Sequence, residues 1–267
     1  GAADALAGIV RFVGEPIARL EEDVLRLLRF FRFYAHYGRG DADLAALAAC
    51  AEMAPQLVRL SGERVWIELR KLLAAPDPLP AWELMAEHGA LPFLLPAPLD
   101  GGARLAELLE VERELGDADP LLRLAALLEG GEAEALAAAD RLRLSNAERD
   151  RLVALRTLPA DFALPLDRRA ARGFLHRLGP ELFTDAVILR AARAPDTPVA
   201  ELFEIAREGV PDFPLAGRDL LGLGLAPGPA VGRLLAALQE GWAGADFRPD
   251  RAALLAEARR RIAAGGI

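Results

Sequence analysis

The chain has 267 residues, of which 53% are hydrophobic and 27% charged, so it is long enough to bury a substantial core. Its formal net charge of −8 argues against general binding to nucleic acid, because non-specific affinity grows with the number of basic contacts. No apolar run approaches the roughly 18 residues of a membrane span, no targeting segment is visible, and Cys50 has no second cysteine with which to pair. We therefore expect a soluble, cytoplasmic protein without a membrane partner, and expect any RNA site to be local.

The first predicted element is a short strand at residues 9–13, where β-branched and aromatic residues follow one another. No second strand is predicted, so this one has no hydrogen-bonding partner in the chain. Elsewhere apolar residues recur at spacings of three and four, as in residues 121–128, which is the helical period. The sequence therefore predicts an all-α, elongated, multi-helical fold with at most one residual strand.

The next predicted element is one continuous helix from about residue 15 to Gly38. Winding it at 3.6 residues per turn gathers an apolar face, which consists of Val24, Leu27, Leu28, Phe31, Tyr34 and Ala35. A second face carries two large aromatic side chains beside charged groups, namely Arg19, Asp23, Arg26, Phe30 and Phe33. Asp23 and Arg26 are three positions apart, so their side chains can lie side by side. From spacing alone, this is an ordinary surface ion pair worth roughly 0.2–0.5 kcal/mol.

Further along the chain, proline and glycine clusters at residues 75–80, 95–102, 158–165 and 194–198 divide the sequence into helical blocks. Helix starts are predicted at Asp119, which precedes a proline, and at Ser145, which has Glu148 at the capping-box spacing. Four arginines lie between residues 167 and 177, and such a cluster is either a solvated face or an RNA-facing one.

The segment 227–232 near the C-terminus joins a turn to a proline and small residues. Gly228 and Gly232 would let a phosphate approach the backbone amides at a helix start. The same residues also suit a compact turn between two helices, and the sequence leaves both interpretations open.

No catalytic or metal-binding group is predicted within this chain. Two Asp-x-Asp strings occur, at residues 41–43 and 117–119, but each stands in a turn or at a helix start and is expected to cap a helix. The three histidines, His36, His88 and His176, are scattered without a zinc spacing and are expected to be structural.

Several segments resemble class II CCA-adding tRNA nucleotidyltransferases and bacterial poly(A) polymerases. The nucleotide-templating motif of that family is resembled by Glu22, Asp23, Leu25, Arg26, Arg29, Arg32 and Phe33. Residues 10–16 resemble the hinge between the family's head and neck, and residues 60–73 resemble its next neck segment. Residues 215–232 resemble its tail element, whereas residues 80–210 match only in helical character.

The resemblance implies an enzyme that adds C, C and A to tRNA 3′ ends, with the protein itself selecting the incoming base. A carboxylate at Asp23 accepts from the exocyclic amine of cytosine or adenine, and a guanidinium at Arg26 donates to cytosine O2 and N3 or to adenine N1. Uracil and guanine offer a carbonyl instead, which would leave a buried group unsatisfied at about 1–3 kcal/mol. The expected partners are therefore CTP, ATP and tRNA. Arg19 and Arg29 are weaker candidates for positioning the nucleotide, and Phe30 and Phe33 are expected to pack.

The resemblance also implies a domain order: residues 1–14 as the remnant of the head-neck hinge, 15–84 as neck, 85–158 as body and 159–267 as a tRNA-binding tail. The expected RNA-phosphate contacts are Gly228, Gly232, Arg168, Arg169 and Arg172. Mg²⁺ would be held by carboxylates of a head that precedes this chain, so the chain alone is expected to be inactive. The alternatives are a poly(A) polymerase of the same family and a non-catalytic helical RNA-binding or scaffold module. The oligomeric state is not predicted.

Overall fold

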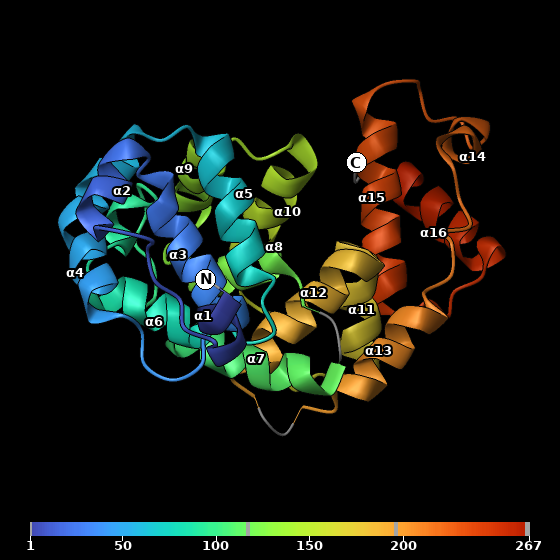
Figure 1. The fold of residues 1–267 in the computed structure, drawn as a ribbon. Helices are drawn as coiled ribbons and strands as arrows, with labels where there is room; N and C mark the ends of the chain where they lie inside the picture. The colour runs from blue at the N-terminus through green and yellow to red at the C-terminus, as the bar shows by residue number, and fades with distance from the viewer. Residues whose placement is uncertain (1, 116–117, 195–196, 265–267) are drawn as a thin grey trace. The chain divides into compact units, whose positions relative to one another are not determined.

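The computed structural model describes residues 2–115, 118–194 and 197–264, and it divides into two compact units. Unit 1 comprises Gly1–Phe162 and Asp185–Pro195, and unit 2 comprises Ala163–Thr184 and Asp196–Ile267. Helices make up both units (Figure 1). Within the described ranges the β-structure is limited to one isolated antiparallel bridge between Leu99 and Leu128, so the all-α prediction is confirmed. The boundaries of neck, body and tail stay a prediction.

Unit 1 contains the helices from the N-terminal half of the chain. They are α1 (Ala2–Ala7), α2 (Pro16–Glu22), α3 (Leu25–Tyr37), α4 (Leu44–Met53), η1 (Ala54–Arg59), α5 (Gly62–Leu73), α6 (Leu79–Glu87), η2 (Leu91–Phe93), α7 (Ala103–Leu115), α8 (Pro120–Leu127), α9 (Glu132–Leu142) and α10 (Asn146–Arg156). The division between the units falls inside α12 (Pro180–Ala191). Unit 2 holds α11 (Arg168–Leu178), α13 (Val199–Glu208), α14 (Gly217–Gly222), α15 (Pro229–Gly244) and α16 (Arg251–Ala263).

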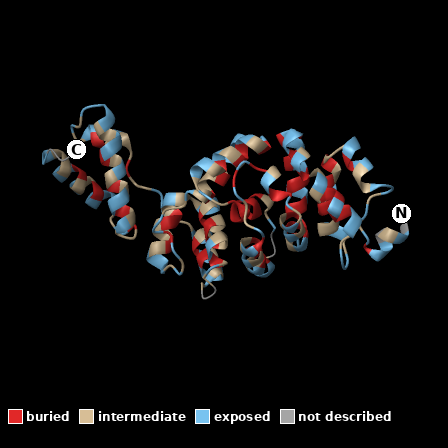
Figure 2. Cartoon of the chain, turned by 90° about the vertical axis from the view of Figure 1, so that its left-hand side faces the viewer, coloured by how far each residue is buried: buried red, intermediate tan, exposed pale blue. Residues whose placement is uncertain are grey.

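The core of unit 1 forms where α3 packs against α5 and α6. From the predicted apolar face of α3, Leu27, Leu28 and Phe31 are buried, each at 2% exposure or less. Trp82 of α6 is fully buried beside this layer. Burying one such side chain contributes about 1.5–3 kcal/mol, so α3 is held chiefly by this apolar stripe. Figure 2 shows the same pattern along the chain, with buried residues on one side of most helices and exposed ones on the other.

The prediction of one continuous helix over residues 15–38 is wrong, because the helix is interrupted between α2 and α3. Asp23 has extended backbone angles of −158° and 104°, and its Oδ1 accepts a hydrogen bond from the Leu25 amide at 3.2 Å. An aspartate side chain that bonds nearby backbone in this way competes with the helix. The carbonyl of Asp23 then accepts from the Arg26 amide at 3.0 Å, so α3 starts directly after the break.

The predicted strand at residues 9–13 is also absent from the described part of the chain. The segment runs without regular structure and is held by side chains instead. Phe12 stacks on Phe30 of α3 with ring centroids 5.5 Å apart, and Arg19 Nε donates to the Val13 carbonyl at 3.0 Å. With no second strand beside it, the β-propensity of these residues has no ladder in which to act.

A buried ion pair joins α7 and α8 to the end of α5. Arg123 is 2% exposed, and its Nε and Nη2 lie 2.8 and 2.7 Å from Glu112 Oε2. Its Nη1 donates to the carbonyls of Leu73 and Ala75, which caps the C-terminal end of α5. Burial is the main influence on Glu112 and raises its pKa, although Arg123 acts in the opposite direction.

The helix starts predicted at Asp119 and Ser145 are confirmed. Asp119 accepts from the amides of Leu121 and Leu122, while Ser145 and Glu148 form a reciprocal capping box at the start of α10. The second oxygen of Glu148 accepts from Trp66 Nε1 of α5 at 3.2 Å. One carboxylate thus caps α10 and joins it to α5.

Glycine allows α5 to approach α9 closely. A Cβ on Gly62 would lie 1.9 Å from the backbone carbonyl oxygen of Arg141. This distance is too short for any side-chain atom, so only glycine fits here without a shift of the backbone. Arg141 in turn donates to the carbonyls of Leu57 and Leu60, just before α5. The start of α5 is therefore held against α9 by a close backbone approach together with the Arg141 side chain.

Unit 2 has its own core around Trp242 of α15, where Leu220, Leu234, Leu238 and Leu254 are buried. Nη1 and Nη2 of Arg251 both donate to the Asp219 carboxylate, and the Ala216 amide donates to the same carboxylate at 2.7 Å. These bonds hold the pKa of Asp219 at about 2, below its usual 3.8. No helix in the described ranges has the length and apolar character that a bilayer crossing requires.

Candidate functional site

The break between α2 and α3 places the Asp23 carboxylate opposite α5. Nη2 of Arg64 lies 3.0 Å from both carboxylate oxygens of Asp23, and the Asp23 side chain is 29% exposed. Oδ1 also accepts from the Leu25 amide, whereas among the described residues Oδ2 accepts a hydrogen bond from Arg64 alone. Asp23 is therefore fixed on one side and still open to solvent on the other.

Arg26 does not form an ion pair with Asp23 in the described part of the chain. Its Nη1 donates to the Arg19 carbonyl at 3.0 Å and to the carboxylate of Glu22. Arg19 also donates to Glu22, at 2.7 Å. The hydrogen bonds from Arg26 and then Arg19 lower the pKa of Glu22, so this carboxylate stays ionised and anchors both arginines.

A cavity of about 470 Å³ opens beside these residues. Four of the five side chains that were predicted to share one helix face line it, namely Arg19, Arg26, Phe30 and Phe33, and Arg29 of α3 lines it as well. The opposite wall is the segment 10–13. The structure thus brings both weaker candidates, Arg19 and Arg29, to the same cavity as Arg26, while Asp23 is not among its lining residues.

A buried glutamate of α5 forms ion pairs with two arginines of α3. Glu68 of α5 is 5% exposed and pairs with Arg29 at 3.3 Å and Arg32 at 3.1 Å. Arg32 also lies over the Phe33 ring, 4.4 Å from its centroid, which is a cation–π arrangement. Phe33 remains 43% exposed, so the expectation that it simply packs holds only for Phe30, which is 3% exposed.

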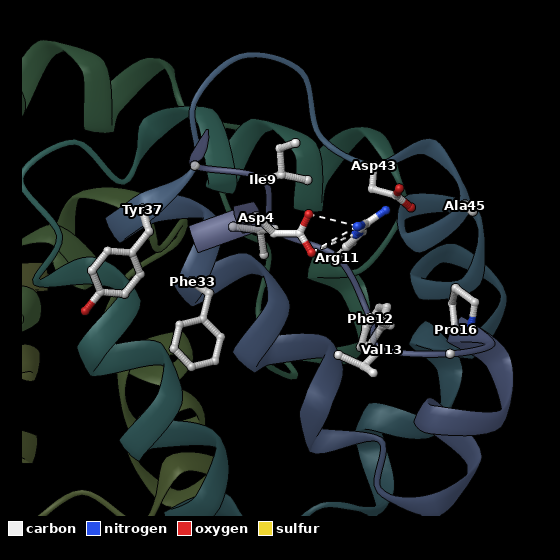
Figure 3. A pocket seen from close by; sticks show the side chains of 13 residues that line it. Asp4, Ile9, Arg11, Phe12, Val13, Pro16, Phe33, Tyr37, Asp43 and Ala45 are labelled. Carbon is white, nitrogen blue, oxygen red and sulfur yellow. Dashed lines mark hydrogen bonds and ion pairs between the residues drawn. The ribbon is translucent and has the colours of Figure 1, made fainter. Parts of the chain in front are cut away.

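A second, larger cavity of about 850 Å³ is also lined by the segment 10–13 (Figure 3). Phe33 and Tyr37 of α3 contribute to its lining, and so do Arg11 and Asp4, whose side chains bind each other at 2.8 Å. Val13 and Tyr37 are 82% and 64% exposed. The two cavities therefore share Phe33 and residues 10–13 as a common wall.

The predicted RNA contacts of the tail lie within unit 2. Arg168, Arg169 and Arg172 are engaged by the unit itself, through the Glu208 carboxylate, the Gly244 carbonyl and the Asp246 carboxylate respectively. Gly228 precedes α15 with φ of 151°, and neither it nor Gly232 has any atom within 4 Å of an added Cβ position. The start of α15 is therefore open, whereas the arginines already have protein partners.

The Asp-x-Asp strings behave as caps where they are described. Asp43 accepts from the Ala46 amide at 2.8 Å and Asp119 caps α8, while Asp117 lies outside the described residues. Within the described ranges no group of three or more His, Cys, Asp or Glu side chains is placed to hold a metal ion. His36 contacts the Lys71 carbonyl and His176 contacts Gln239, which are packing roles.

Sequence reasoning missed Arg64 as the partner of Asp23, although the segment 60–73 had been singled out. The two residues are 41 positions apart, and no periodicity within one helix connects them. The sequence feature that could have pointed to Arg64 is the adjacent pair Glu63 and Arg64 within the segment 60–73.

Comparisons with known proteins show what the chain as a whole is similar to. Residues 43–99 match the family model described as "Probable RNA and SrmB- binding site of polymerase A". The crystal structure of the Bacillus stearothermophilus CCA-adding enzyme in complex with CTP superimposes with a TM-score of 0.76 at 25% identity, over 99% of this chain and 68% of that one. The chain is therefore similar to class II CCA-adding enzymes and poly(A) polymerases.

Two curated relatives are similar in sequence to this chain over most of its length. The mitochondrial CCA tRNA nucleotidyltransferase 1 of Mus musculus is 31% identical over 96% of this chain, and that of Danio rerio is 30% identical over 92%. The chain spans 59% and 58% of the lengths of these relatives.

Proposed function

We propose that this chain is the base-selecting and RNA-holding part of a tRNA nucleotidyltransferase that adds CCA to tRNA 3′ ends. The names of its relatives support this activity, as does its likeness to a CCA-adding enzyme bound to CTP. CTP, ATP and tRNA are the proposed substrates. The cytoplasmic location stays a proposal, because both of these relatives are mitochondrial proteins.

The observation that carries the proposal is the set of hydrogen-bonding groups left over around Asp23 and Arg26. Asp23 Oδ2 can accept a further hydrogen bond beside that from Arg64, and Nε and Nη2 of Arg26 have no hydrogen-bond partner among the described residues. An acceptor and donors that are fixed by Arg64 and Glu22 but not used up by them suit the amine and ring nitrogen of cytosine or adenine. Arg19 and Arg29 would then face the triphosphate or ribose across the cavity.

The test uses the full-length gene product and calorimetric titration with each of the four nucleoside triphosphates. We expect CTP and ATP to bind more tightly than UTP and GTP, and Asp23→Ala to remove most of that difference. Asp140→Ala is the matched control, because Asp140 is a carboxylate with 81% exposure on α9. Equal affinity for all four nucleotides, or an Asp23→Ala protein that still discriminates, would contradict base selection by this residue.

The tail is proposed to contact tRNA phosphates at the open start of α15, with Arg168, Arg169 and Arg172 as secondary candidates. Backbone amides at a helix N-terminus favour an anion, and the glycines leave the approach clear. The three arginines would first have to leave their contacts within unit 2. Nucleotidyl transfer also needs Mg²⁺-binding carboxylates, which the described residues do not supply, and we therefore propose that this chain alone is inactive.

A poly(A) polymerase is the second candidate, because the description of the family model that matches residues 43–99 names polymerase A. Both activities use ATP, so the distinguishing assay offers tRNA lacking its 3′-terminal CCA together with CTP and ATP. Incorporation limited to three residues in a CTP-dependent manner supports the CCA-adding enzyme. Long adenosine tracts without a CTP requirement support the polymerase, and no incorporation by the full-length product supports a non-catalytic RNA-binding or scaffold module.

A further inference from the structure

Four arginines converge on a small polar cavity in unit 1, away from the segments that resemble the family's motifs. The cavity has a volume of about 150 Å³. Its basic lining comes from three helical regions, namely Arg104 of α7, Arg156 at the end of α10, and Arg190 and Arg193 at and just after the end of α12. This concentration is unusual in a chain whose net charge is −8.

The acidic residues of the lining do not balance these charges. Glu107 is the one carboxylate among the lining residues, and its Oε2 lies 3.4 Å from Arg193 Nε, which is a long contact. The guanidinium groups of Arg104 and Arg190 have no hydrogen bond or ion pair with any residue in the described ranges. The cavity wall therefore carries an excess of about three positive charges at neutral pH.

Arg156 shows most directly that an acceptor is lacking. Its Nη1 donates to the Ala125 carbonyl at 3.0 Å and its Nη2 donates to the Gly130 carbonyl, so the guanidinium is held in place. Its Nε is buried and has no hydrogen-bond partner. Burial first, and then the charges of Arg104, Arg190 and Arg193, lower the pKa of Arg156. A buried donor without a partner is unfavourable, and a bound acceptor would satisfy it.

We propose that this cavity binds a phosphate group. Guanidinium groups match phosphate oxygens in both charge and bidentate geometry, and groups from separate helices suit a tetrahedral oxyanion better than a planar carboxylate. The phosphate comes either from a phosphodiester of bound RNA or from free inorganic phosphate. The site does not involve Asp23 or Arg26, so it stands independently of base selection.

The test is calorimetric titration of the folded 267-residue chain with inorganic phosphate, at an ionic strength held constant with chloride. Arg104→Gln and Arg190→Gln should each weaken phosphate binding by about tenfold or more, because a hydrogen bond to a charged group is worth about 1.5–3 kcal/mol. Glu107→Gln should strengthen it, because this substitution removes the carboxylate that faces the ligand. Arg113→Gln is the matched control, since Arg113 lies on the same helix as Arg104, is exposed, and among the described residues pairs with Glu110 alone.

The proposal is overturned if phosphate binds no better than chloride, or if Arg113→Gln weakens binding as much as Arg104→Gln does. Because Arg104 and Arg190 hold no other side chain, their variants should keep the thermal midpoint of the parent chain. The Glu107→Gln variant excludes partial unfolding as the cause of the affinity changes, because partial unfolding would not increase phosphate affinity.

A second arm identifies the source of the phosphate by measuring tRNA affinity against salt concentration. If the site takes an RNA phosphodiester, Arg104→Gln lowers tRNA affinity and reduces the slope of log K against log salt by roughly 0.9. If it takes the free ion, phosphate binding is lost while tRNA affinity is unchanged. Neither result depends on nucleotide selectivity, so failure here and failure of base selection by Asp23 are distinguishable.

Discussion

Arg64 of α5 holds the carboxylate of Asp23 from a distance of 41 residues along the chain, with Nη2 placed 3.0 Å from both oxygens. The contact orients a carboxylate that belongs to neither α2 nor α3. Arg64 is thus a positioning residue for the proposed base contact.

Replacing Arg64 should separate positioning from stability. Arg64→Gln is expected to lower the free energy of unfolding by only about 0.2–1 kcal/mol, because the pair is partly exposed. In the full-length protein the same change should reduce the preference for CTP over UTP, since Asp23 would rotate freely. Urea unfolding and calorimetric titration measure the two effects. Lys71→Gln, a charge loss on the same helix, is the control and should leave nucleotide preference unchanged, and an Arg64→Gln protein with parental selectivity would disprove the positioning role.

The buried pair of Arg123 and Glu112 should be a large determinant of stability. Arg123→Met leaves Glu112 buried without its counter-charge and frees two carbonyls at the end of α5, so we expect a loss of about 3–5 kcal/mol by urea unfolding. Replacing both residues with methionine should recover much of that loss. A double variant as unstable as the single one would show that helix capping, not the charge, dominates.

The pH dependence of the Arg123→Met variant follows from the raised pKa of Glu112. A carboxyl whose pKa is higher in the folded state than its ordinary 4.5 favours folding below pH 4.5, and that contribution is lost as the pH rises through the folded pKa. Without Arg123 the folded pKa should rise further. The stability deficit of the variant should therefore shrink as the pH falls from 7 toward 4.5, and a deficit that is constant over this range would argue against an uncompensated charge.

Gly62 and Gly173 should respond to alanine in opposite directions. Gly62→Ala places a methyl group against the backbone of α9 and should destabilise the protein by about 1–3 kcal/mol. Gly173 lies inside α11 with open space at its Cβ position, so Gly173→Ala should stabilise by about 0.5–1 kcal/mol. Thermal unfolding of both variants checks the pair, and equal effects would mean that α5 and α9 are not in backbone contact.

Acid should loosen unit 2 at Asp219. Its pKa of about 2 lies below the usual 3.8, so the bond to Arg251 contributes stability above pH 3.8 that is lost as the pH falls through 2. The Ala216 amide donates to this carboxylate, and its NMR resonance should titrate with a midpoint near 2. Arg251→Gln should move the midpoint toward 3.8. A parental midpoint already near 4 would contradict the ion pair.

The helical period predicted the all-α fold and the apolar stripe of α3, because burial follows directly from spacing. It failed at Asp23, where a hydrogen bond between side chain and backbone and an arginine from another helix outweigh the tendency to continue the helix. The same limit explains Arg64 itself, since contacts between distant helices leave no mark on local periodicity.

The candidate site was predicted unevenly. The spacing of Arg19, Arg26 and Phe30 predicted that they share one face, and in the structure they line one cavity although α2 and α3 are separate helices. The partner of Asp23 and the basic cavity around Arg156 were not predicted, because Arg104, Arg156 and Arg190 meet only after three helices pack. Charge clusters that form across helices cannot be seen in a linear scan. The cluster at 168–172 could be seen, and two of its arginines, Arg168 and Arg172, pair with carboxylates within unit 2.

The two oxygens of the Glu148 carboxylate should couple the unfolding of α10 to that of α5. Because it caps α10 with one oxygen and accepts from Trp66 with the other, fraying of the first turn of α10 would also release the indole of α5. The two helices, 82 residues apart in sequence at this contact, are thereby expected to unfold as one unit, so hydrogen exchange should report a single opening energy for both.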